Sequence, residues 1–202
     1  MISALRLGKW SAIVLIIIGI LYLVTGVIGT FFGGRFWPPR QVDPWLAIME
    51  WLLLISVPFM VLLMLAIHAC AREQKKIYSL SAFSFMIIAS TITGTIHFLQ
   101  LTTLRAENNA NKTTVQGLFL YADLLAWDLF FGLSLFFASF VFSKNSATKL
   151  IFRSMIITGC LCLVGFLGPA TGFMQLQALA ILGYTVSFMW VCFLLAKFFS
   201  AL

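Results

Sequence analysis

The sequence predicts an all-α, polytopic integral membrane protein in which residues 1–202 form one bundle of six transmembrane helices. Three observations favour this class. The chain is 62% hydrophobic and 9% charged, whereas soluble domains carry about 25% charged residues. Six long apolar stretches follow one another, and an uncharged run of about 20 residues can span a bilayer as a helix. The basic residues lie mainly in the short segments between these stretches.

The expected spans are nearly free of charge, and the segments between them are too short and polar to form a further domain. In chain order they are Ser11–Phe32, Pro44–Cys70, Tyr78–Thr103, Leu118–Phe142, Leu150–Gly168 and Ala178–Lys197. Arg6 and Lys9 precede the first span, as they would in a signal peptide. That apolar run is too long for a signal peptide and lacks an Ala-x-Ala-like exit, so we expect a retained helix.

The distribution of Lys and Arg predicts the orientation of the bundle. Nine basic residues fall on the side of the termini and four on the other side, which places both termini in the cytoplasm. The positive-inside pattern explains the net charge of +7, so no nucleic-acid partner is expected. We predict a multi-pass protein of a bacterial inner membrane, in contact with membrane lipids; the oligomeric state stays open.

The third span carries a polar stripe. Ser90, Thr93, His97 and Gln100 recur at intervals of three and four residues, so they share one face of a helix. This face should point toward other helices of the protein. A polar side chain that faces the lipid without a hydrogen-bond partner costs several kcal/mol.

Ionisable residues of three spans are expected in one layer of the outer half of the membrane. By helical rise, Glu50, His97 and Asp123 each lie about 8–9 Å from the outer ends of their spans, and Asp128 lies deeper, at about 15 Å. Asp123 and Asp128 are five residues apart, which separates them by about 140° around an α-helix. We therefore expect Asp128 to be the interior carboxylate near Glu50 and His97, with Asp123 nearer the mouth.

These residues predict an outward-facing polar pocket for the binding, or proton-linked transport, of a small amphiphilic or cationic molecule. Two alternatives stay open: an intramembrane enzyme using His and carboxylate acid-base chemistry on a lipid or isoprenoid, and a structural or assembly subunit. No cofactor or metal is expected, although Glu50, His97 and Asp128 could hold one divalent ion. The expected ligand-binding residues are Glu50, His97, Gln100, Asp123 and Asp128, with walls formed by Tyr121, Trp51 and Trp127.

The loop after the first span contains Trp37, Pro38 and Pro39, followed by Trp45 at the start of the second span. Its prolines favour extended backbone and its tryptophans suit the headgroup layer, so it is expected to cover the outer mouth of the bundle. In these residues the chain resembles the translocator protein family, which implies a site for porphyrin-like or sterol-like ligands. That family has five spans whereas six are expected here, so the chain is not assigned to it.

Overall fold

The computed structural model describes residues 2–33, 43–106, 112–142 and 148–201, and these residues are almost entirely helical. The first half contains α1 (Ile2–Gly33), α2 (Trp45–Cys70) and α3 (Lys76–Ala106), with a short 3-10 turn η1 (Glu73–Lys75) before α3. Two composite segments and one continuous helix make up the second half. The elements are α4 (Lys112–Leu124), η2 (Leu125–Phe131), α5 (Gly132–Ser139), η3 (Phe140–Phe142), α6 (Lys149–Thr171), η5 (Met174–Leu176), α7 (Gln177–Leu182), η6 (Gly183–Ser187) and α8 (Phe188–Ala201).

Within the described residues, six helical stretches are long and apolar enough to cross a membrane, which confirms the predicted number of spans. Five of them are longer than the spans expected from sequence, because these helices continue past the apolar run into flanking residues, and the second begins one residue later than expected. Their bounds are Ser3–Gly33, Trp45–Cys70, Glu73–Thr102, Val115–Phe142, Lys149–Thr171 and Met174–Ala201.

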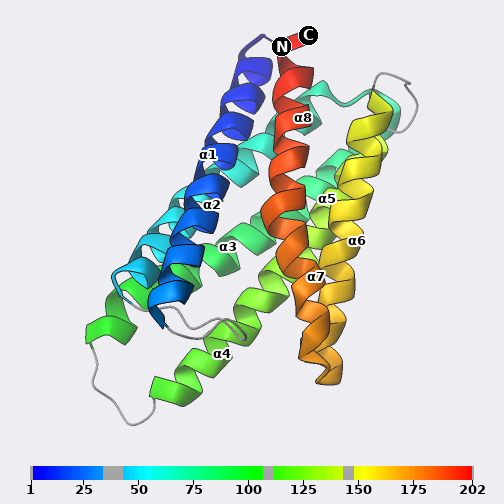
Figure 1. The fold of residues 1–202 in the computed structure, drawn as a ribbon. Helices are drawn as coiled ribbons and strands as arrows, with labels where there is room; N and C mark the ends of the chain where they lie inside the picture. The colour runs from blue at the N-terminus through cyan, green and yellow to red at the C-terminus, as the bar shows by residue number, and fades with distance from the viewer. Residues whose placement is uncertain (1, 34–42, 107–111, 143–147, 202) are drawn as a thin grey trace.

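The spans form a closed ring in chain order, with α8 packing back on α1. α1 also packs on α2, α2 on α3, and α3 on both η2 and α5. The ring continues from α5 to α6 and from α6 to α7 and α8. Both termini lie at the same end of the bundle (Figure 1). Short connections between antiparallel neighbours explain this order.

The core is formed by large apolar side chains from every part of the ring. Methionine is prominent among them, as expected where irregular gaps between helices must be filled. The largest side chains with almost no exposed area are Phe131, Met60, Leu63, Met64, Ile67, Met86, Leu135, Met155, Leu195 and Val191. Phe131 of η2 packs edge-on against Phe188 of α8, with ring centroids 4.8 Å apart.

Small residues allow α6 to approach its neighbours closely. A Cβ atom added at Gly165 would lie 2.3 Å from the Cβ of Ala180 in α7, and one added at Gly159 would lie 2.9 Å from the carbonyl oxygen of Gly132. Backbones can approach this closely only where no side chain intervenes. α6 ends at Thr171, and the next residue, Gly172, has a φ of 80°, the left-handed conformation that glycine adopts without strain.

In the part of the chain that the structure describes, two spans change from α-helical to π-helical hydrogen bonding partway along. The π-helical segments are η2 in the fourth span and η6 in the sixth. Trp127 of η2 and Tyr184 of η6 face each other with ring centroids 5.4 Å apart. π-helical turns are rare and often occur at functional sites. The level of the bundle at which Trp127 meets Tyr184 is therefore a candidate position for a functional site.

A hydrogen bond between spans gives a test of the packing. The Ser134 hydroxyl of α5 donates to the Ala82 carbonyl of α3 at 2.7 Å, and both residues are buried. Replacing Ser134 with Ala is expected to lower the free energy of unfolding by about 0.6 kcal/mol, the usual size of such bonds in membranes. Equilibrium unfolding in mixed micelles measures this change in the free energy of unfolding. Ser84→Ala is the control, because Ser84 is exposed and bonds only within its own helix; equal effects in both variants would contradict the assignment.

Candidate functional site

His97 lies between two carboxylates that come from different spans. Its Nδ1 is hydrogen-bonded to Oε2 of Glu50 in α2, and its Nε2 lies 3.4 Å from Oδ1 of Asp123 in α4. The side chains of His97 and Glu50 are buried, at 5% and 9% exposed, while that of Asp123 is 24% exposed. An imidazolium donates from both ring nitrogens, so this arrangement suits a protonated ring held by two acids.

Gln100 completes the contacts of Glu50. Its amide lies against both Glu50 and His97, and with the NH₂ group directed toward the carboxylate it donates to Glu50 Oε2 at 2.7 Å. The opposite orientation would bring the amide oxygen against carboxylate oxygens, which are also acceptors. The polar stripe of α3 faces inward as predicted: Ser90, Thr93 and His97 are all buried.

A cavity of about 80 Å³ lies next to Asp123, between the first, second, fourth and sixth spans. Most of its surface is apolar or aromatic, and Asp123 is the acidic residue that lines it. The lining residues are Leu15, Ile18, Gly19, Tyr22, Leu53, Ser56, Met60, Asp123, Leu124, Trp127, Tyr184, Thr185 and Phe188.

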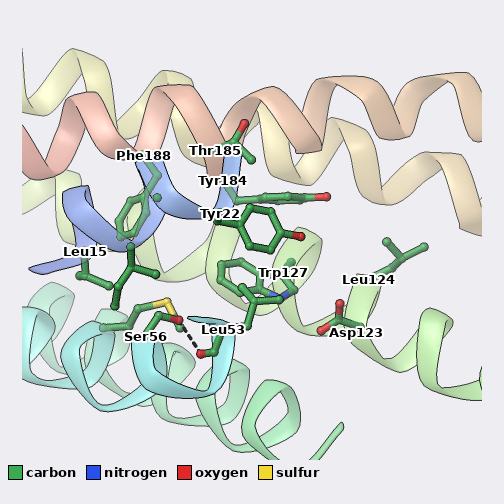
Figure 2. Close-up of a pocket in the computed structure, with 13 residues that line it drawn as sticks. Leu15, Tyr22, Leu53, Ser56, Asp123, Leu124, Trp127, Tyr184, Thr185 and Phe188 are labelled. Carbon is green, nitrogen blue, oxygen red and sulfur yellow. Dashed lines mark hydrogen bonds between the residues drawn. The ribbon is translucent and has the colours of Figure 1, made fainter. Parts of the chain in front are cut away.

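The aromatic side chains give the cavity a polar end and an apolar end. Figure 2 shows the rings of Tyr22, Trp127 and Tyr184 side by side, with both tyrosine hydroxyls directed toward the end at which Asp123 lies. Leu15 and Phe188 lie at the other end. The Ser56 hydroxyl donates to the carbonyl of Leu53 at 2.7 Å. A ligand group with a positive charge or several donors would therefore be held at the Asp123 end.

Asp128 belongs to a different polar pair from the one expected. Its side chain is fully buried, and its Oδ1 accepts a hydrogen bond from Nε2 of Gln177 at 3.2 Å. Gln177 is the first residue of α7 and is itself 6% exposed. Asp128 is therefore an interior carboxylate, as predicted, but the acid that lies beside His97 together with Glu50 is Asp123 and not Asp128.

The π-helical turn η2 explains this difference. The expected separation of about 140° between Asp123 and Asp128 assumed an α-helix throughout. Asp128 lies inside η2, where i→i+5 hydrogen bonds bring residues five apart nearer to one face. Both aspartates therefore point into the bundle, Asp123 toward His97 and Asp128 toward Gln177.

Two of the three expected aromatic walls lie elsewhere. Trp51 is 55% exposed and Tyr121 is 58% exposed on the outside of the bundle, so the expectation that they line the pocket is wrong. Both side chains lie on the outward-facing sides of their helices. Trp and Tyr are common at such positions near a membrane–water interface. Trp127 does line the cavity.

The sequence reasoning missed Tyr22, Tyr184 and Gln177. Tyr22 lies in the expected span Ser11–Phe32, which contains no charged residue, and its side chain lies within electrostatic range of both Asp123 and Glu50. Tyr184 lies near Gln177 and Asp128. A lone tyrosine in an apolar span could have signalled an inward-facing polar group, whereas Gln177 was placed just outside the sixth span.

The described residues contain no group of three His, Cys, Asp or Glu side chains converging as metal ligands. His68, the second histidine, is 2.8 Å from the Ser79 hydroxyl, near the connection between α2 and α3. The expected cover formed by Trp37, Pro38 and Pro39 lies outside the described residues.

The fold and the buried acid–imidazole cluster define the class of the molecule as a helical bundle with the dimensions and apolarity of a polytopic membrane protein. Comparisons of the chain with protein-family models, curated proteins and solved structures give no match. No match therefore supports the resemblance to the translocator protein family.

Proposed function

We propose that this protein is a multi-pass membrane protein that binds a small cationic molecule, or the cationic group of an amphiphile, with linked uptake or release of protons. The observation that carries the proposal is the position of His97 between Glu50 and Asp123, with Asp123 also lining the adjacent cavity. With the termini in the cytoplasm, as the Lys and Arg bias predicts, this site lies in the outer half of the membrane.

The charges around the cavity favour a cation. Its lining includes Asp123 but no Lys or Arg, and Glu50 lies just beyond, on the far side of His97. The faces of Trp127, Tyr22 and Tyr184 add an electron-rich surface that attracts cations, worth about 2 kcal/mol where water is excluded. Pockets for drug-sized ligands measure about 300–1,000 Å³, so a cavity of about 80 Å³ suits the cationic end of a small ligand such as a benzylammonium ion.

The linked proton follows from the same geometry. His97 is hydrogen-bonded to Glu50, and its Nε2 lies within ion-pair distance of Asp123, at 3.4 Å. A cation at Asp123 would compete with the ring for that acid. Protons and the ligand therefore act on one small set of groups. Proton-linked transport would require such competition, because a ligand that does not favour one protonation state cannot change it.

The enzyme hypothesis gains support from the contact between His97 and Glu50, since acid-base catalysis needs these groups within hydrogen-bonding reach. A general base also needs a ring nitrogen directed at the substrate. Nε2 of His97 is directed instead at Asp123, which favours binding over catalysis. A purely structural role does not account for the cavity beside Asp123.

Asp123→Asn is expected to weaken the binding of benzylammonium at least about tenfold, a change of about 1.4 kcal/mol. The substitution keeps the shape of the side chain and removes its charge. Calorimetry on the purified protein in detergent measures the affinity, and benzyl alcohol serves as the neutral analogue. Glu73→Gln is the control, because it removes the same charge from an exposed side chain outside the site.

The affinity for benzylammonium is also expected to fall as the pH is lowered, because protons compete with the cation for the carboxylates. Binding in a weakly buffered solution should release protons, which a pH indicator detects. Unchanged affinity in the Asp123→Asn variant, or equal binding of benzyl alcohol, would contradict the proposed site.

A further inference from the structure

The pair formed by Asp128 and Gln177 contains two buried oxygen atoms without a donor. Among the described residues, Asp128 Oδ2 and Gln177 Oε1 have no hydrogen-bond partner, although both side chains are buried. Both atoms accept hydrogen bonds and cannot satisfy each other when Asp128 is ionised. Unsatisfied buried acceptors are rare in folded proteins and call for an explanation.

One added proton satisfies both atoms. A neutral carboxylic acid has one donor and one acceptor, and a primary amide has the same complement along one edge. The amide already donates from Nε2 to Oδ1 at 3.2 Å. If Oδ2 carries a hydrogen, it can donate to Oε1 of the same amide, so the two groups form a ring with two parallel hydrogen bonds.

We propose that Asp128 and Gln177 form a proton-binding site inside the bundle, in which Asp128 is a neutral acid at pH 7 and donates its proton to the Gln177 carbonyl. The ligand of this site is the proton itself. Loss of the proton breaks one of the two hydrogen bonds and leaves two acceptors facing each other in the buried interior. The site shares no residue with the cluster of Glu50, His97 and Asp123.

The groups around Asp128 agree with a neutral acid. Asp123 approaches from α4, Cys162 from α6 and Tyr184 from η6, and none of them is a cation. On the side of α3, Phe85 stacks on Phe130 of η2. The ion pairs of the described residues include none to Asp128, so nothing there compensates a negative charge in a low-dielectric interior.

The chain offers a sharp test because it contains only three aspartates, Asp43, Asp123 and Asp128. Protein labelled with ¹³C at the aspartate side-chain carboxyl should give three NMR signals, whose shifts distinguish the neutral acid from the carboxylate. At pH 7 one signal is expected at the position of the neutral acid. That signal should disappear in Asp128→Asn and persist in Asp123→Asn.

Stability supplies a second readout that does not depend on assigning the signal. In Asp128→Asn the new side-chain amide can form the same two hydrogen bonds with Gln177. This variant should therefore keep the melting temperature of the wild type at pH 7 and retain it at alkaline pH, where the wild type loses stability. Asp128→Leu and Gln177→Leu, which remove the ring of hydrogen bonds, should both melt at lower temperature.

Three aspartate signals at the carboxylate position at pH 7 would overturn the proposal, as would a neutral-acid signal that survives in Asp128→Asn. A wild type and an Asp128→Asn variant with the same loss of stability at alkaline pH would also overturn it. The experiments use no cationic ligand, so their result is independent of whether benzylammonium binds beside Asp123.

Discussion

Replacing His97 with Leu is expected to destabilise the protein by roughly 3–5 kcal/mol, the usual consequence of removing one partner from a buried ion pair. Glu50 would lose its His97 contact while remaining buried, with Gln100 as its other neighbour. Asp123 would lose its contact with Nε2 at the same time. Unfolding of the purified variant in mixed micelles, followed by tryptophan fluorescence, measures the change.

Two further variants make this test specific. His68→Leu removes the other histidine of the chain, whose ring is hydrogen-bonded to the Ser79 hydroxyl, so a loss of about 1 kcal/mol is expected. Combining His97→Leu with Glu50→Leu should restore much of the lost stability, because no unpaired charge is left at that position. A His97→Leu variant that is as stable as His68→Leu would show that the buried pair has no such role.

The second large effect is expected at the contact between α6 and α7. In Gly165→Ala the new methyl group would lie 2.3 Å from the Cβ of Ala180 and 2.9 Å from its backbone nitrogen. No flexible side chain can move aside there, so the two helices must separate. Overpacking of this kind costs about 1–3 kcal/mol, and the melting temperature in detergent should fall accordingly.

Gly94→Ala is the matched control, because its new methyl group would meet only Val57 of α2, at 3.7 Å, an ordinary van der Waals contact. Its stability should be unchanged or slightly raised, since Ala favours a helix more than Gly does. Separation of α6 and α7 should also move Gln177 away from Asp128. Equal stabilities of the two variants would contradict the close packing at Gly165.

Several features of the site could be predicted because they depend only on local geometry. The inward polar stripe of α3 follows from the helical period, and the common depth of Glu50, His97 and Asp123 follows from the rise per residue. These three residues lie together in the structure. The partner of Asp128 could not be found in this way, because Gln177 is 49 residues away in the chain.

The sequence alone determined the number of spans and the presence of costly polar groups inside them, because hydropathy and helical period are properties of each segment by itself. Only the tertiary structure decided which acid meets His97, that Trp51 and Tyr121 face outward, and that Tyr22 and Tyr184 line the cavity. These outcomes depend on which faces of the spans meet when the ring closes, and the rotation of Asp128 relative to Asp123 also depends on the π-helical turn η2. Contacts between distant segments are not a property of any single segment.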